Sequence, residues 1–157
     1  FKMITNEWYM GKQNAQTAME IRKKVLVDEL KLSPFSQFDS SDDQAMHLVV
    51  SINEVPAATG RVYYDFENKT FTVDKYCVLK EFRGQGIGEL TFKLLLYKVF
   101  EYCEKAEIVV LPKYEEYYGR YGFVKKSDEL GEGHTPLVRL ILEKENLVYP
   151  SKCKGHN

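Results

Sequence analysis

A glycine-rich turn between two apolar segments constrains this chain more than any other feature. The turn is Arg83-Gly84-Gln85-Gly86-Ile87-Gly88; it follows the apolar run Tyr76-Cys77-Val78-Leu79 and opens a long apolar segment that reaches Ala106. Glycines at alternate positions remove every second Cβ, so a ligand can approach the backbone closely. A helix that begins here presents free N–H groups and partial positive charge at its first turn. The pattern therefore predicts a strand, a turn and a helix around a phosphate site, with Arg83 adding forked donors.

Two well-known phosphate loops do not fit this turn. A Walker loop ends in Gly-Lys-Ser/Thr, whereas Glu89 and Leu90 follow Gly88 here. A dinucleotide fingerprint has the spacing G-x-G-x-x-G, whereas this turn has G-x-G-x-G. A dinucleotide-binding enzyme is therefore disfavoured, and a ligand-free turn stays open as an alternative.

Composition excludes several classes of protein. A chain of 157 residues that is 44% hydrophobic can bury one core, so we expect a single domain over residues 1–157. A net charge of −1 gives no basic surface for nucleic acid. Apolar runs stay below the roughly 20 residues that span a membrane. The cysteines are odd in number and lack metal-ligand spacing, which predicts no metal and reduced thiols in a cytoplasmic protein: Cys77 and Cys103 in the core, and Cys153 in an exposed tail.

The first part of the chain predicts a strand, a helix and a polar loop. Residues 3–9 form a weakly patterned strand. Thr17 and Glu20 have the spacing of a capping box, which predicts a helix over 18–30 with Thr17 as its N-cap. Ser33-Pro34 should end this helix. The polar segment 35–43 is interpreted as a solvated connector, with one wall of a substrate cleft as the alternative.

The remainder predicts a meander followed by alternating strands and helices. Residues 45–52 alternate, with Met46, Leu48, Val50 and Ile52 on one face and His47, Val49 and Ser51 on the other. Short turns to strands at 56–65 and 71–79 indicate an antiparallel meander. The later elements are expected as a helix over 86–106, a strand over 107–111, a helix over 114–121 capped by Gly122, a strand from 123, a polar loop over 128–136, a strand over 137–142 and a frayed tail from 143.

A second motif makes a resemblance to a known family specific. Leu79–Gly88 resembles the coenzyme A diphosphate loop, Gln/Arg-x-x-Gly-x-Gly/Ala, of the GNAT superfamily of N-acetyltransferases. Tyr117–Phe123 resembles the second signature of that family, Phe/Tyr-Tyr-x-x-x-Gly-Phe. The two motifs stand in the family's order, and the resemblance extends over about residues 59–142. The first half is loosely similar to the small ElaA-like branch.

The resemblance implies an α+β (mixed α/β) fold. A central mixed sheet would begin with the antiparallel meander, and a parallel pair of strands in its middle would splay apart. Helices would flank this sheet.

The resemblance also implies an acetyl-CoA-dependent N-acetyltransferase that acts on a primary amine of a small molecule or peptide. Tyr118 would protonate the leaving thiolate, since a phenol with a pKa of about 10 can act as an acid towards a poorly solvated thiolate. The backbone near Cys77 and Val78 would hold the pantetheine amides and the developing oxyanion. The diphosphate would be bound by Arg83, Gly84, Gln85, Gly86, Ile87 and Gly88.

Several points stay open at this stage. Glu29, His47 and Asp74 are general-base candidates by residue type alone, and water is an alternative. Leu111 stands where family members often carry Asn or Gln that contacts coenzyme. A non-catalytic acyl-CoA sensor of the same fold is therefore the alternative function. Neither the acceptor amine nor the oligomeric state can be read from the residues; a homodimer is one option because relatives are often dimers.

Overall fold

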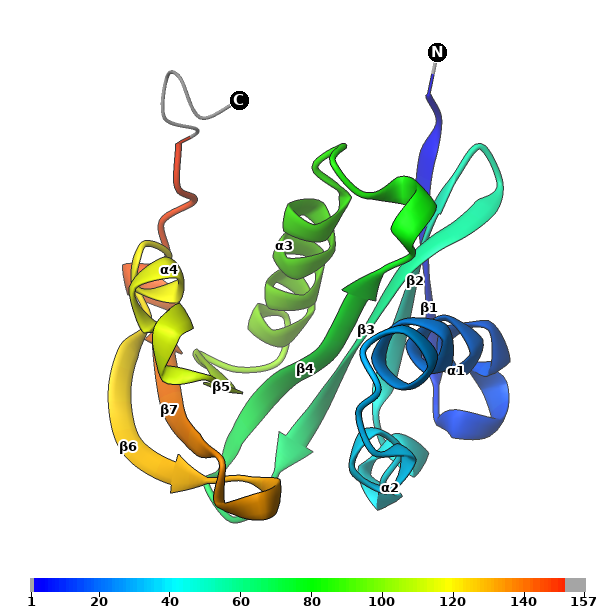
Figure 1. Ribbon diagram of the computed structural model, residues 1–157. Coiled ribbons are helices and arrows are strands. Elements are labelled where there is room, and N and C mark those ends of the chain that lie inside the picture. The colour runs from blue at the N-terminus through cyan, green and yellow to red at the C-terminus, as the bar shows by residue number, and fades with distance from the viewer. Residues whose placement is uncertain (1, 152–157) are drawn as a thin grey trace.

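A computed structural model describes residues 2–151, and these residues build one mixed sheet with helices on both faces (Figure 1). The seven strands lie in the order β1-β2-β3-β4-β5-β7-β6. All neighbouring pairs are antiparallel except β4 with β5. The predicted mixed α+β fold is confirmed. The strands are β1 (Ile4–Met10), β2 (Met46–Ile52), β3 (Val55–Asp65), β4 (Thr70–Val78), β5 (Lys105–Val110), β6 (Val124–Leu130) and β7 (Pro136–Glu143).

The helices are short except for one. That one is α3 (Ile87–Phe100), and α1 (Gln16–Arg22) continues into a π-helical turn, Lys23–Glu29. The other α-helices are α2 (Pro34–Gln37) and α4 (Glu115–Gly119). Single 3-10 turns connect the elements at Lys12–Asn14, Ser40–Asp43, Lys80–Phe82, Pro112–Tyr114, Glu132–His134 and Lys144–Asn146.

Strand alternation divides the apolar side chains between two cores. Leu48, Val50 and Ile52 of β2 face the larger core, which includes the buried side of α3, as the period of two predicts. Val49 of β2 faces the smaller core under α1. In Figure 1, α1 and α2 accordingly lie on one face of the sheet, and α3 stands beside β4 on the side of the larger core.

The parallel pair in the middle of the sheet is very short. Strands β4 and β5 are paired only at Phe71 with Ala106 and at Thr72 with Glu107. Beyond Thr72 the two strands diverge (Figure 1), so the β5-facing edge of β4 has no strand partner there. Strand β4 also contains a bulge, because the register with β3 shifts between Thr59 and Arg61, and Lys75 there has a φ of 51°.

One predicted boundary in the first half of the chain is wrong, and another is incomplete. Thr17 is not the N-cap: α1 begins at Gln16, and Ala15 occupies the cap position without a side-chain hydrogen bond. Burial of Ala15 and Ala18 against the sheet fixes where this helix starts, rather than the local capping pattern. Ser33-Pro34 begins α2 instead of only ending the preceding helix, because the Ser33 hydroxyl accepts a hydrogen bond from the Phe35 N–H.

The second half contains further differences. Helix α3 ends at Phe100 rather than near Ala106, since Lys105–Val110 is a strand paired with β7 along its whole length. Strand β6 extends to Leu130, into the region expected to be a loop. The segment after Glu143 was expected to fray, but two backbone hydrogen bonds hold its first residues against the rest of the fold. The Lys144 N–H donates to the Glu104 carbonyl, and the Val148 N–H donates to the Tyr121 carbonyl.

Two remaining expectations concern membranes and thiols. Within residues 2–151, every helix is too short or too polar to cross a bilayer. Cys77 is buried and Cys103 is partly buried, and both are free thiols. Cys153 lies outside the described residues.

Candidate active site

The glycine loop (Arg83–Gly88) leaves open space above its backbone. Gly84 and Gly86 both have a φ of 78°, a conformation that favours glycine, and a Cβ built on either would meet nothing within 4 Å. Gly86 is also the N-cap of α3, and no side chain caps that helix end. The first N–H groups of α3 are therefore available to a ligand from outside. This loop fits a diphosphate, because it offers backbone donors, a helix N-terminus and the space for close approach.

The side chains of the loop are used differently from the sequence-based expectation. The guanidinium of Arg83 donates two hydrogen bonds to the Glu29 carboxylate, each 2.7 Å long, and its Nε donates to the Val78 carbonyl at 3.0 Å. Its forked donors thus point at a carboxylate instead of into the loop. Gln85 accepts a hydrogen bond from Lys2, and Ile87 is buried in the larger core. At Ile87 only the backbone remains for a ligand.

The end of β4 next to the loop presents backbone rather than side chains. The Cys77 side chain packs into the smaller core, where burial raises the pKa of its thiol to about 12. The Val78 side chain packs against the larger core. Strand β3 pairs with both residues on one side, and β5 does not reach them on the other. The free edge of β4 is therefore where an extended ligand can add hydrogen bonds.

Tyr118 lies beside the diverging strands. Its hydroxyl is hydrogen-bonded to that of Tyr76 on β4, so α4 and β4 are joined across the gap between β4 and β5. Both tyrosines line a pocket of about 240 Å³. Burial raises the pKa of Tyr118, and the hydrogen bond with Tyr76 partly opposes that shift. The other residues around the pocket are Leu26, Gln37, Val73, Asp74, Lys75, Ile108, Val109 and Val110.

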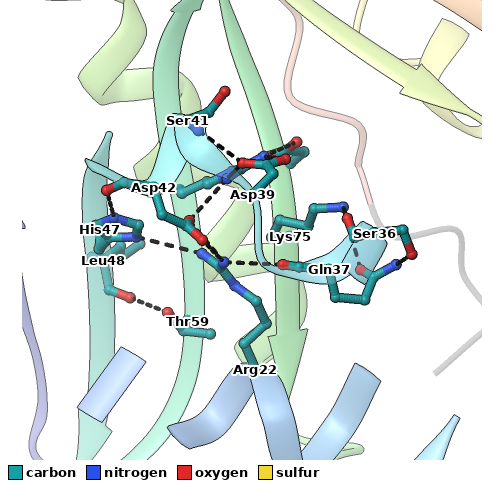
Figure 2. A network of polar contacts seen from close by, with 12 residues as sticks. Arg22, Ser36, Gln37, Asp39, Ser41, Asp42, His47, Leu48, Thr59 and Lys75 are labelled. Atoms are coloured by element: carbon teal, nitrogen blue, oxygen red, sulfur yellow. Dashed lines mark hydrogen bonds and ion pairs between the residues drawn. The ribbon is translucent and has the colours of Figure 1, made fainter. Parts of the chain in front are cut away.

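A buried polar network (Figure 2) adjoins this pocket, whose lining includes Gln37, Asp74 and Lys75 of the network. Its centre is Arg61, which is 1% exposed and donates five hydrogen bonds to the carboxylates of Asp39, Asp42 and Asp74. Arg22 of α1 pairs with the same Asp42 at 2.8 Å. The network thereby ties α1 and the segment after α2 to strands β3 and β4. The acidic segment expected to be a solvated connector is thus buried at Asp42.

The candidate general bases are all engaged elsewhere. Both oxygens of Asp74 accept hydrogen bonds from Arg61. Burial lowers the pKa of His47, whose Nε2 donates to the Asp42 carbonyl at 2.9 Å. Glu29 pairs with Arg83. All three side chains are therefore already held by other groups of the protein.

Two features of the site escaped the sequence reasoning. Tyr76 was interpreted only as part of a strand, because its orientation depends on the bulge at Lys75. Nothing in the local sequence pairs Asp42 with Arg22 and Arg61, which lie 20 and 19 residues away.

Comparison with known proteins agrees with this geometry. Residues 12–123 match the model of the acetyltransferase (GNAT) family. A Bacillus subtilis protein named as a candidate acetyltransferase is 33% identical over 92 residues, which are 57% of this chain and 58% of that protein. The chain thus spans less than two thirds of the length of this relative.

Solved structures show the same fold at low identity. A candidate N-acetyltransferase of Lactobacillus plantarum superposes with a TM-score of 0.77 at 20% identity, covering 89% of this chain and 97% of that one. Escherichia coli ElaA superposes with a TM-score of 0.73 at 16% identity, covering 90% and 100%. Since the family match extends over more than half of the 157 residues, this chain belongs to the GNAT family of acetyltransferases.

Proposed function

We propose that this protein binds acetyl-CoA and transfers the acetyl group to a primary amine of a small molecule or peptide. One observation carries the proposal: an open glycine loop leads into α3 next to the free edge of β4, and the Tyr118 hydroxyl lies across that edge, bonded to Tyr76. With its diphosphate bound in the loop and its pantetheine arm lying along β4, acetyl-CoA would have its thioester directed at Tyr118. Acetyl-CoA supplies an activated acyl group bound to a good leaving thiolate.

The residues of the chain would share the binding work. The N–H groups of Gly84–Gly88 and of the first turn of α3 would bind the diphosphate. The unpaired edge of β4 near Cys77 and Val78 would hydrogen-bond the pantetheine amides. Backbone N–H groups at the same edge would stabilise negative charge on the carbonyl oxygen.

Tyr118 would act as the general acid. Burial raises the pKa of its phenol, so the hydroxyl is protonated at neutral pH, and the higher pKa by itself makes it a weaker acid. A thiolate formed in the same poorly solvated pocket is destabilised too, because burial disfavours the charged form of both groups. Proton transfer from Tyr118 to sulfur is therefore favourable enough to support catalysis.

A second candidate is a non-catalytic acyl-CoA sensor. One observation favours it: Glu29, His47 and Asp74 are each held by other groups of the protein, so a side-chain base is not supplied by any of these three. Water would have to accept the proton in the enzyme. A sensor would bind acetyl-CoA and release no thiol.

The experiment follows thiol release from acetyl-CoA with a panel of amines that includes amino acids, polyamines, amino sugars and short peptides. We expect one class of amine to support turnover, and Tyr118→Phe to lower kcat about 100-fold. Binding of acetyl-CoA without turnover by any amine would favour the sensor. Unchanged kcat in Tyr118→Phe would remove Tyr118 from the acid role.

One feature supports a cytoplasmic setting for this activity. Cys77 and Cys103 are free thiols, as in proteins from reducing compartments. The net charge of −1 suits a small-molecule or peptide partner better than nucleic acid. We propose no metal requirement and keep a homodimer as an arrangement to be tested by light scattering.

A further inference from the structure

The backbone of β4 turns Tyr76 towards Tyr118. In an uninterrupted strand Tyr76 would share a face with Thr72 and Asp74. The bulge at Lys75 adds one residue, so Tyr76 instead faces the larger core, where its ring lies 5.2 Å from that of Phe92. Gly60 on β3 makes room for it, since a Cβ there would lie 2.9 Å from the Tyr76 Cβ and 2.6 Å from Leu95 Cδ1.

The ring of Phe92 also fixes the second tyrosine of the pair. Its centroid lies 5.3 Å from that of Tyr118, so one aromatic side chain of α3 supports both phenols. Tyr118 is 8% exposed, and its hydroxyl is bonded to that of Tyr76 inside the pocket between β4 and β5. Two phenols in contact can share only one proton between their oxygens, so one hydroxyl donates and the other accepts.

The direction of this hydrogen bond decides what Tyr118 can do. If Tyr118 donated to Tyr76, its proton would be unavailable to a ligand. If Tyr76 donates, the proton of Tyr118 is free to point into the pocket. For Tyr118 to give its proton to a ligand, Tyr76 must be the donor in this contact, and once Tyr118 is ionised the Tyr76 hydroxyl holds the one hydrogen left between the two oxygens.

We propose that Tyr76 is a positioning residue for acetyl transfer: it donates its hydroxyl hydrogen to the Tyr118 oxygen, aims the Tyr118 proton into the pocket and stabilises the Tyr118 phenolate. This inference rests on the proposed function. In the transfer, the amine nitrogen bonds to the carbonyl carbon and the carbon–sulfur bond breaks with its electron pair on sulfur. Sulfur takes the Tyr118 proton, the amine loses its own proton to water, and solvent reprotonates Tyr118.

The first test measures the hydrogen bond without any reaction. Protein labelled with 3-fluorotyrosine is titrated by fluorine NMR, and the Tyr118 resonance is assigned by its loss in Tyr118→Phe. We expect Tyr76→Phe to raise the pH at which Tyr118 ionises, because the phenolate loses a donor. The matched control is Tyr97→Phe, which removes an exposed hydroxyl on α3 and should leave the Tyr118 titration in place. An unchanged or lowered ionisation pH in Tyr76→Phe would overturn the proposal.

The second test uses kinetics on the full chain. Loss of a hydrogen bond to a developing charge should lower kcat in Tyr76→Phe by about tenfold or more, with little change in KM for acetyl-CoA. In a Tyr118→Phe background the same substitution should cost nothing further, since there is no phenolate to stabilise. Equal losses in both backgrounds would assign Tyr76 a packing role only. A wild-type protein that turns over no amine would refute the proposed function, while the fluorine titration would still decide the role of Tyr76 towards Tyr118.

Discussion

The carboxylate of Glu29 accepts two hydrogen bonds from the guanidinium of Arg83, each 2.7 Å long. This ion pair joins the first residue of the glycine loop to the last residue of the π-helical turn that follows α1. Both side chains are partly exposed, so the pair adds little to folding stability. The ion pair matters for ligand binding instead, because a diphosphate in the loop would compete with Glu29 for the same forked donors of Arg83.

Removal of this competitor should therefore tighten coenzyme binding. We expect Glu29→Gln to lower the Kd for coenzyme A by about two- to fivefold, the range for an exposed ion pair. Isothermal titration calorimetry measures this change. The control is Glu81→Gln, which removes the same charge from the adjacent 3-10 turn without releasing Arg83. Weaker binding by Glu29→Gln would mean that Glu29 holds Arg83 in its working position.

The open space above Gly86 should be needed for the ligand. In Gly86→Ala a methyl group would stand in that space, and we expect coenzyme A binding to weaken by tenfold or more, on the order of the loss of one or two hydrogen bonds. A fair control is Gly133→Ala, because Gly133 also has a positive φ, 66°, with nothing within 4 Å of a built Cβ. Both variants place alanine at a positive φ with open space around its methyl group, so the comparison separates a ligand effect from backbone strain of a similar kind. Equal affinities in calorimetry would place the diphosphate elsewhere.

The buried network predicts a large stability loss on removal of its central cation. Arg61→Met leaves three carboxylates without their shared partner, and we expect the free energy of unfolding to fall by about 3–5 kcal/mol. Urea denaturation followed by circular dichroism gives this value. Lys105→Met, which breaks an exposed ion pair with Glu143, should change stability little. Similar losses in the two variants would contradict a structural role for the network.

Buried His47 should make the fold sensitive to mild acid. Burial lowers its pKa, so the unfolded chain takes up the proton first as the pH falls from about 7. Stability should then decrease as the pH falls through about 6.5 and towards the lower, folded value, by at most about 1.4 kcal/mol per pH unit for one proton. His47→Gln should flatten this part of the curve. A wild-type curve parallel to that of His47→Gln between pH 7 and pH 5 would show that His47 does not titrate on unfolding.

Local patterns predicted the parts of the fold that depend on near neighbours. The alternation in β2 assigned Leu48 and Val50 to one core and Val49 to the other, and the structure confirms both assignments. The glycine loop was correctly expected between a strand and a helix, because Gly84 and Gly86 have a conformation that other residues resist.

The rest depended on contacts far apart in the chain. Thr17 and Glu20 formed a plausible cap, but burial of Ala15 and Ala18 set the start of α1. Asp42 lies in a polar segment that predicts exposure to solvent, but Arg22 and Arg61 enclose it. Tyr76 gained its contact with Tyr118 through a bulge that no residue pattern marks. The sequence predicted the glycine loop and singled out Tyr118, whereas tertiary packing determines which side chains are in contact.

Amide NMR tests the central claim most directly. Titration of the labelled protein with coenzyme A should shift the backbone N–H resonances of residues 84–89 and those at the end of β4 more than any others, and NAD should shift none of them. Shifts confined to other parts of the protein, or a response to NAD but not to coenzyme A, would contradict a coenzyme A site in the glycine loop.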